Sequence, residues 1–263
     1  MTRQLVIERV VKEFPARGNG APVRALEGIE LEVQEGEFVS LLGPSGCGKS
    51  TLLNIIAGFQ RPTGGRVLHE GVEVTSPDRR RTVVFQDYAL FPWMTVQQNV
   101  EFGLKAQGAP AARRRDIARG FLALVHLVGF EERYPHEISG GMKQRAALAR
   151  ALAPNPDILL MDEPFGALDA QTRVLLQEEV ARISAETKKT VLFVTHSIEE
   201  AVFLGDRVVV MSARPGRVRT ISPVLLARPR TPAIRREPAF VSLVEDLWES
   251  LKPEWQERRT DNA

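Results

Sequence analysis

The chain has 263 residues, enough for one large domain or two small ones. Hydrophobic residues make up 43% and charged residues 26%, which excludes a wholly disordered, collagen-like or disulfide-scaffold protein. The 35 basic and 33 acidic residues leave a net charge of +2, so we expect no nucleic acid as a partner. Cys47 is the single cysteine, which excludes an intramolecular disulfide and a cysteine-based zinc site.

Neither a secretory signal nor a membrane span is expected from the sequence. The N-terminus has no long apolar core before charged residues return. The longest apolar run, residues 121–128, contains His126 and is far shorter than the roughly 20 residues that cross a bilayer. We therefore expect a cytoplasmic protein, unless a partner holds it at a membrane.

The first third of the chain is predicted to form short strands. Apolar, β-branched runs bounded by glycines and charged turns mark them. They lie at residues 5–11, 29–33, 38–42, 66–68, 72–74 and 82–85.

A helical period replaces this pattern over residues 95–153. Thr95 and Gln98 have the spacing of a capping box at a helix start. One apolar helix face is predicted from Ile117, Phe121, Leu124 and Val128, with Gly129 as its stop. A further helix is predicted at 141–153, before two prolines.

Buried strands alternate with helices in the last third of the chain. Strands are predicted at 158–161, 191–195 and 208–211, with a helix between the first two. Continuously apolar strands in this arrangement indicate a parallel sheet covered on both faces. Residues 222–238, rich in proline and arginine, are typical of a linker, and Phe240, Leu243, Val244, Leu247 and Leu251 predict a final amphipathic helix. The arginine clusters at 79–81, 113–115 and 228–236 are interpreted as solvated surface.

These patterns divide the chain into four parts. We expect a nucleotide-binding core with a β subdomain at 1–87, a helical segment at 88–155, the continued core at 156–222 and a C-terminal extension at 223–263.

The strongest chemical signal is a glycine-rich loop between a predicted strand and a predicted helix. Two glycines four residues apart, followed by lysine and a hydroxyl residue, form a cradle of backbone N–H groups for phosphate oxygens. Lys49 is expected to reach the β- and γ-phosphates and Ser50 to hold Mg²⁺. The candidate nucleotide-binding residues here are Gly43, Pro44, Ser45, Gly46, Cys47, Gly48, Lys49, Ser50 and Thr51. The sequence therefore predicts binding of a nucleoside triphosphate.

Two acids end the predicted strand 158–161. Ligands of open parallel sheets lie beyond the carboxyl ends of the strands, so both acids are expected at the phosphate site. Asp162 is suited to Mg²⁺, and Glu163 could orient and deprotonate an attacking water.

A second motif, Ile-Ser-Gly-Gly-Met-Lys-Gln-Arg at 138–145, indicates which class of nucleotide-binding protein this is. Ser139 with Gly140 and Gly141 opens a helix, which gives a second set of N–H groups for an anion. The motif resembles the signature of ATP-binding cassette (ABC) ATPases, with Ile138 in place of the usual leucine.

Other positions resemble further motifs of this family. Gln86 is similar to the glutamine of its Q-loop. The segment ending at Asp169 is similar to its D-loop, which makes Asp169 a further candidate nucleotide-binding residue. His196 resembles its switch histidine, and Phe14 is the candidate for stacking on adenine. The resemblance covers nearly all of residues 1–222, with the motifs in the family's order.

The resemblance implies an α/β fold, with a P-loop NTPase core of mostly parallel strands, an antiparallel β subdomain and an inserted helical subdomain. It also implies an ATPase that uses ATP and Mg²⁺, with Ser50, Gln86 and Asp162 as metal ligands. Two copies would sandwich ATP between the phosphate loop of one and Ser139 to Gly141 of the other. Glu163 would be the general base and His196 would contact the γ-phosphate, with Gln86 as a further catalytic residue.

Residues 84–96 and 196–216 resemble the ATPase subunits of nitrate, sulfonate and taurine importers. This implies a homodimer bound to two copies of a separate permease at the cytoplasmic face of the membrane, served indirectly by an extracytoplasmic binding protein. Trp93 could be an interface aromatic, although a core or hinge role is equally compatible with the sequence. The alternatives are a soluble ABC-type ATPase acting on nucleic acid or ribosomes, and a nucleotide-binding regulator without turnover.

Overall fold

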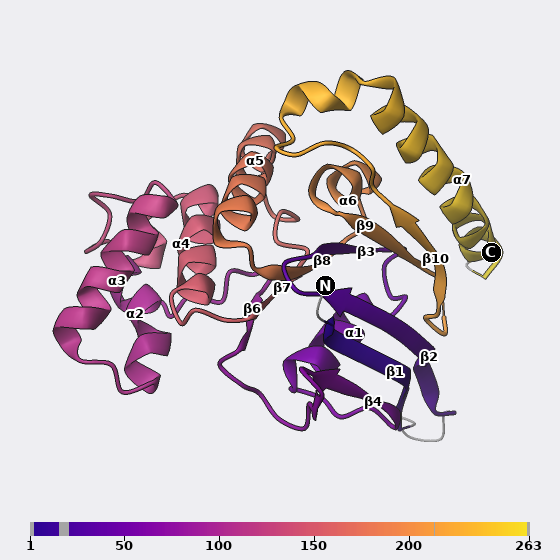
Figure 1. Ribbon diagram of the computed structural model, residues 1–263, viewed down its shortest axis with the longest axis horizontal. Helices are drawn as coiled ribbons and strands as arrows, with labels where there is room; N and C mark the ends of the chain where they lie inside the picture. Colours follow the sequence, from indigo (N-terminus) through magenta and orange to yellow (C-terminus); the bar gives the residue numbers. More distant parts are fainter. Residues whose placement is uncertain (1–2, 16–20, 213, 262–263) are drawn as a thin grey trace. The chain divides into compact units, whose positions relative to one another are not determined.

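The computed structural model describes residues 3–15, 21–212 and 214–261, with side chains described as far as residue 252. The chain forms two units (Figure 1). The first contains residues 1–77 and 190–263, and the second contains residues 78–189.

An antiparallel sheet forms one part of the first unit. Its strands follow the order β2-β1-β4-β5. They are β1 (Arg3–Phe14), β2 (Val23–Gln34), β4 (Gly64–His69) and β5 (Val72–Glu73). Leu5 and Ile7 of β1 face inward and are buried, as alternation on a half-buried sheet requires. This is the antiparallel β subdomain that the resemblance implies.

Parallel strands form the other part of the first unit. β3 (Phe38–Leu42) pairs in parallel with β8 (Thr190–Thr195) and with β9 (Arg207–Met211). β10 (Val218–Pro223) adds to β9 in the antiparallel direction. Every residue of β3 and β8 is buried, which explains why these strands are mostly apolar in sequence.

Three α-helices accompany these strands. They are α1 (Lys49–Ala57), α6 (Ile198–Leu204) and α7 (Pro238–Asp261), with a 3-10 turn η2 (Pro232–Arg236) before α7. Gly58 caps the carboxyl end of α1, and its left-handed φ of 83° lets its N–H donate back to the carbonyls of Asn54 and Ile55. α7 packs against α6, as Figure 1 shows.

The second unit is mostly helical. β6 (Arg81–Val84) and β7 (Ile158–Asp162) pair in parallel. The helices are α2 (Val96–Ala106), α3 (Ala111–Leu124), α4 (Gly140–Leu152) and α5 (Ala170–Thr187), with a 3-10 turn η1 (Pro135–Glu137). α2 begins with the predicted capping box, because the Thr95 hydroxyl accepts from the Gln98 N–H and the Gln98 side chain accepts from the Thr95 N–H.

The predicted apolar face of α3 is wrong by about one residue. Ala118 and Leu122 are the fully buried residues, whereas Val128 lies beyond the helix and is exposed. One residue turns a helix by about 100°. The small Ala118 lets α3 approach α2 and α4 closely, so the side of α3 that carries Ala118 and Leu122 is the one that is buried.

The predicted helix stop at Gly129 is also wrong. α3 ends at Leu124, and His126 takes the left-handed conformation with φ 55°. The Leu127 N–H then donates to the Leu122 carbonyl at 2.8 Å, and the Leu127 side chain is buried. The left-handed residue of this Schellman arrangement, His126, comes three residues before Gly129, because burial of Leu127 offsets the cost of a non-glycine residue there.

The interpretation of two arginine clusters as solvated surface is wrong in part. Arg81 and Arg230 are 8% and 6% exposed. Arg230 belongs to the segment predicted as a linker, and this segment is folded: part of it is β10, and η2 follows. Phe240, Leu247 and Leu251 are buried in α7, as predicted.

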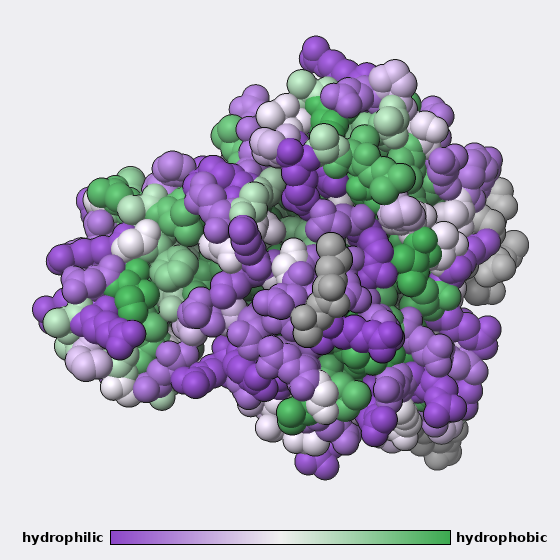
Figure 2. All heavy atoms as spheres, viewed as in Figure 1, coloured by the Kyte–Doolittle hydropathy of each residue, from purple (hydrophilic) through white to green (hydrophobic). Residues whose placement is uncertain are grey.

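The second unit is longer than the helical segment expected at 88–155, because it also includes β6, β7 and α5. The finer domain boundaries at 87/88 and 155/156 stay a prediction. Hydrophilic residues dominate the face in Figure 2, with smaller hydrophobic areas between them. Among the described residues, no helix is long and apolar enough to span a membrane.

Candidate functional site

The phosphate loop, residues 43–50, connects β3 to α1 as the sequence predicts. Gly46 and Gly48 have left-handed φ values of 77° and 94°, which L-residues other than glycine rarely adopt. α1 begins directly after Gly48. The first N–H groups of a helix have no partner within it, so the start of α1 is suited to an anion.

Close packing explains why glycine is required in this loop. A Cβ on Gly48 would lie 2.5 Å from Leu26 Cδ2 and 2.9 Å from the Ala25 carbonyl oxygen. A Cβ on Gly43 would lie 2.8 Å from the Met211 carbonyl oxygen. The loop is therefore enclosed by β2 and β9, which fix the direction of its backbone donors.

Lys49 is held inside the phosphate loop. Its ammonium donates to the carbonyl oxygens of Gly43 at 2.7 Å and Pro44 at 2.9 Å, and the residue is 4% exposed. The Cys47 thiol lies 3.8 Å from the ammonium. Burial raises the pKa of Cys47 more than the nearby Lys49 charge lowers it, so the thiol stays protonated at neutral pH.

His196 leaves the parallel sheet beside the phosphate loop. In the β3–β8 register, Leu42 pairs with Thr195, so the next residues, Gly43 and His196, leave adjacent strands at the same edge. Ligands of open α/β sheets bind at this edge. His196 is exposed and lies directly before α6.

Phe14 ends β1 and is half-buried. The Lys12 ammonium lies 5.3 Å from the centre of its ring. A partly exposed ring beside a cation is compatible with stacking on a nucleotide base, and this role stays a prediction.

In the second unit, Gln86 and the two acids also leave adjacent strands at one edge. Val84 pairs with Met161 in the β6–β7 register. Gln86, two residues after Val84, and Asp162, the residue after Met161, therefore leave the two strands at the same edge. A Cβ on Gly166 would lie 3.2 Å from Gln86 Nε2 and 3.4 Å from the Glu163 carbonyl oxygen. The structure thus brings Gln86 near the segment that contains Glu163.

Glu163 has an unusual backbone. Its φ is +43°, in the left-handed region that costs a non-glycine residue about 1 kcal/mol or more. Its carbonyl accepts from the Gly166 N–H at 3.1 Å, which closes a tight turn after β7. Such strain is found preferentially where a side chain must point in one direction, as a catalytic carboxylate must.

The signature motif begins α4 in the predicted way. Ser139 is the N-cap, and its hydroxyl accepts from the Met142 N–H at 3.3 Å. A Cβ on Gly140 would lie 3.3 Å from the Tyr88 hydroxyl, and one on Gly141 would lie 2.6 Å from Thr172 Cγ2. The start of α4 therefore lies beside the Q-loop and the start of α5, and glycine is needed for that approach.

Asp169 is the N-cap of α5. Its carboxylate accepts from the N–H groups of Gln171 at 3.1 Å and Thr172 at 3.0 Å. The bond from the Thr172 N–H is the main reason why the pKa of Asp169 is lowered. The cap is a structural role that the sequence prediction did not include.

Two residues that the sequence analysis did not single out hold the chain after Gln86. Arg150 on α4 donates to the carbonyls of Tyr88, at 3.0 Å, and Ala89, both of which have positive φ values. Burial lowers the pKa of Arg150. Asn99 on α2 is fully buried and bonds Phe91 through both its N–H and its carbonyl, at 2.8 and 3.2 Å. A polar residue on the buried face of a predicted helix is the one signal that could have identified Asn99.

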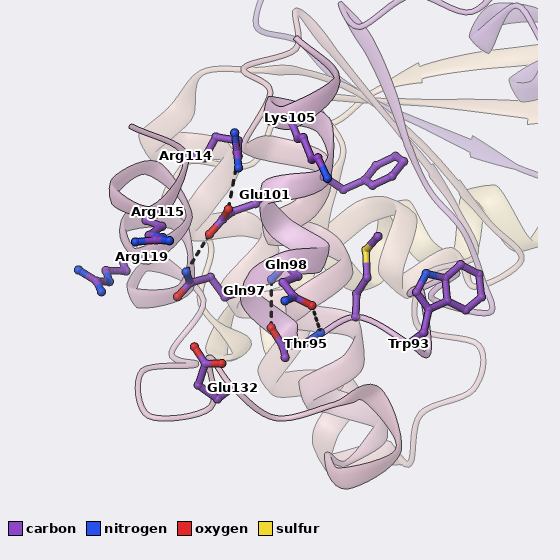
Figure 3. Close-up of a pocket in the computed structure, with 12 residues that line it drawn as sticks. Trp93, Thr95, Gln97, Gln98, Glu101, Lys105, Arg114, Arg115, Arg119 and Glu132 are labelled. Carbon is purple, nitrogen blue, oxygen red and sulfur yellow. Dashed lines mark hydrogen bonds and ion pairs between the residues drawn. The ribbon is translucent and has the colours of Figure 1, made fainter. Parts of the chain in front are cut away.

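These bonds present Trp93 to the solvent. Trp93 is 70% exposed, and its ring lies 5.6 Å from that of Phe91. It borders a groove of about 700 Å³ on α2 and α3, shown in Figure 3. We call this groove the cationic groove: Lys105, Arg114, Arg115 and Arg119 line it together with two acids, Glu101 and Glu132.

Comparison with known proteins identifies the family. A family model described as ABC transporter matches residues 26–166, more than half of the chain. The chain belongs to the ABC transporter family. It is an ATPase with the ABC cassette fold, as the sequence motifs predicted.

Among its relatives, the nitrate import ATP-binding protein NrtD of Synechocystis sp. is 47% identical, over 89% of this chain and 91% of the relative. The taurine import ATP-binding protein TauB of Chromobacterium violaceum is 48% identical, over 92% and 94%. A solved structure, the ATP-binding cassette MJ0796 as a dimer in a post-hydrolysis state with ADP and Pi, matches with a TM-score of 0.74. It is 34% identical, over 85% of this chain and all of that one.

Proposed function

We propose that the chain is the ATP-hydrolysing subunit of an importer, working as a homodimer beneath a separate permease at the cytoplasmic face of the membrane. The importer assignment is supported by the nitrate and taurine import relatives. The homodimer is supported by the dimeric MJ0796 cassette. The observation that carries the ATPase mechanism is the strained turn that presents Glu163 directly after β7.

In the proposed mechanism, ATP lies between the phosphate loop of one copy and Ser139, Gly140 and Gly141 of the other. Lys49 binds the β- and γ-phosphates, and Phe14 stacks on adenine. Glu163 accepts the proton of the attacking water, and His196 contacts the γ-phosphate. Binding energy that differs between open and closed dimers would then move the permease between two states.

Mg²⁺ fits the residues proposed to hold it. Ser50, Gln86 and Asp162 all offer oxygen atoms, the donors that Mg²⁺ prefers. The Asp162 side chain is half-buried at the end of β7, and Ser50 is exposed in the first turn of α1. When bound, Mg²⁺ would neutralise charge on the phosphate oxygens.

Replacing Glu163 by Gln tests the general base. We expect hydrolysis to fall at least about 100-fold while ATP affinity is retained, because the amide cannot accept the proton. Turnover of radiolabelled ATP and equilibrium binding would be measured with purified protein. Glu178→Gln, a change of the same kind on α5, is the control. Undiminished turnover by Glu163→Gln would contradict the assignment.

The cationic groove and Trp93 are the proposed docking site for the permease. An exposed aromatic beside four cations suits a segment with apolar residues and at least one carboxylate. On the groove wall, Glu101 accepts from Arg114 at 3.4 Å and from Gln97 at 2.7 Å (Figure 3). Asn99 fixes the adjacent turn, so the surface is formed before a partner binds.

Co-purification from gently solubilised membranes tests this docking site. We expect the tagged chain to recover a multi-spanning permease, and Trp93→Ala to reduce that recovery at least about tenfold, as for an interface hot spot. Trp248→Ala, which removes a half-exposed tryptophan from α7, is the control. Recovery with ribosomes or DNA and no permease would contradict the importer assignment but leave the ATPase intact.

The proposed cargo is a small anion such as nitrate, sulfonate or taurine. Its support is the similarity to NrtD and TauB. Uptake of each compound by cells with and without the gene would test it, and unchanged uptake of all three would contradict it.

A further inference from the structure

Arg230 is a buried cation in the C-terminal extension. It is 6% exposed, and its guanidinium donates five hydrogen bonds to backbone carbonyls. The acceptors are Val202 at 3.0 Å, Phe203 at 3.1 Å, Gly205 at 2.6 Å, Val224 at 3.4 Å and Leu226 at 3.3 Å. Three of the five belong to the carboxyl end of α6, so Arg230 joins the extension to that helix end.

Arg228 binds the same end of α6. It donates to the Leu204 carbonyl at 2.6 Å and pairs with the Asp206 carboxylate at 2.8 Å. The last carbonyls of a helix have no partner within it and carry partial negative charge, so two guanidinium groups are well matched to them. We call Arg228 and Arg230 the arginine clamp.

The opposite end of α6 fixes the residues around His196. The Thr195 hydroxyl donates to the Glu200 carboxylate at 2.6 Å and accepts from the Ser197 N–H at 3.0 Å. The Ser197 hydroxyl accepts from the Glu200 N–H at 3.4 Å. His196 lies between Thr195 and Ser197, so its backbone position follows that of α6.

The helix between these two ends is short. α6 has seven residues, about two turns, and residues 200–204 are all buried. Closely packed helices move as rigid pieces, so a shift at one end of α6 reaches the other. The extension also covers the helix side: the Arg235 guanidinium lies 4.8 Å from the Phe203 ring centre, and α7 packs on α6.

We propose that the arginine clamp is a positioning device for His196, through which the C-terminal extension sets the rate of ATP hydrolysis. This inference rests on the role proposed above for His196 at the γ-phosphate. Arg228 and Arg230 are positioning residues, since they act through α6 and not on the nucleotide.

A purely stabilising role explains the clamp less well. Burial lowers the pKa of Arg230 to about 10, with a further lowering by Arg228, so the guanidinium is charged at neutral pH in a position that disfavours charge. Burying a charge with hydrogen bonds is often no more stabilising than an apolar side chain of similar size. Five directed bonds do, however, specify the position of the helix end.

The test compares Arg230→Met with Arg236→Ala in the full-length chain. Arg236 is an exposed arginine of the same extension. We expect Arg230→Met to lower ATP turnover about tenfold or more, as small displacements of a catalytic group do. ATP affinity should change less than about twofold, because the phosphate loop makes no bond to the clamp. Arg236→Ala should leave both unchanged.

A double-mutant cycle with His196→Ala separates positioning from general stability. If the clamp acts through His196, Arg230→Met should cause little further loss of turnover in the His196→Ala protein. If the two losses multiply, the clamp proposal is overturned while the ATPase assignment stands. Full turnover of His196→Ala alone would instead overturn the role of the histidine, and the clamp proposal with it.

If the Arg230→Met protein does not fold, Arg230→Lys replaces it in the double-mutant cycle with His196→Ala. It keeps the charge but has one donor nitrogen, which cannot reach carbonyls on both sides of the guanidinium site. Thermal unfolding of each variant identifies the folded ones. A folded Arg230→Lys protein with normal turnover would contradict the proposal.

Discussion

At the scale of single residues, backbone conformation orients the groups that the proposed mechanism uses. Glu163 has a left-handed φ of 43°, and Gly48 has one of 94°. Substitution by a β-branched residue at either position would add strain to any chemical effect. Gln is therefore the suitable replacement for Glu163, because it changes the proton-accepting group and leaves the preference of the backbone nearly unchanged.

Lys49 offers a test at the same scale. We expect Lys49→Ala to weaken ATP binding roughly tenfold to 100-fold, the effect of losing hydrogen bonds between charged groups. Equilibrium binding of a fluorescent ATP analogue would measure the affinity. Lys252→Ala, on the exposed side of α7, is the matched control. An unchanged affinity would refute the assignment of the phosphate loop.

At the scale of elements, α4 connects the motifs of the second unit. Ser139 begins it, and Arg150 near its end binds the carbonyls that follow the Q-loop glutamine. In its middle, Arg145 forms an ion pair with Glu179 of α5 at 3.0 Å, with the Glu179 side chain 5% exposed. One helix therefore fixes the signature, the Q-loop and α5 against one another.

The Arg145–Glu179 pair predicts how this unit responds to pH. Burial raises the pKa of Glu179 above its ordinary value of 4.5, although Arg145, and more weakly His126 and Arg182, favour the charged form. The folded protein then holds the proton more tightly than the unfolded chain, so the contribution of Glu179 to stability is full below pH 4.5 and falls as pH rises through the raised pKa.

Urea unfolding at several pH values would measure this contribution. The unfolding free energy of the wild type minus that of Glu179→Gln should decrease from about pH 4 upward. Glu178→Gln, the adjacent residue on α5, should show no such trend. A difference that grows with pH would mean that attraction to Arg145 outweighs the cost of burial.

At the scale of the whole molecule, the proposed homodimer depends on Ser139 facing the partner's triphosphate. Asn and Asp both keep the N-cap of α4, but only Asp adds negative charge. In the Glu163→Gln background with ATP, we expect Ser139→Asn to permit dimers and Ser139→Asp to prevent them. Light scattering would measure the mass of each. Equal dimerisation would contradict a nucleotide sandwiched at Ser139.

The motif loops could be predicted because each is contiguous with a strand or helix that the local pattern identifies. The phosphate loop, the acids after β7 and the cap at Ser139 all lie where the sequence places them. Strand ends in parallel sheets meet at one edge by a general rule, and the β3–β8 register places Gly43 and His196 at the same edge in this way.

The buried polar contacts could not be predicted in this way. Arg230 lies 25 to 28 residues from the α6 carbonyls that it binds, and Arg150 lies 61 and 62 residues from those after Gln86. A charged residue in a polar stretch has the same sequence pattern whether it is solvated or buried against carbonyls.

The sequence by itself determined the phosphate loop and most of the strands and helices, because glycine geometry, capping and apolar periodicity act over a few neighbouring residues; the family followed from the resemblance of its motifs. Only the tertiary structure decided which side of α3 is buried, how Glu163 turns, and that the C-terminal extension binds α6. Those outcomes depend on which surfaces and carbonyl groups meet after the chain has folded, and on the free energy of packing them together.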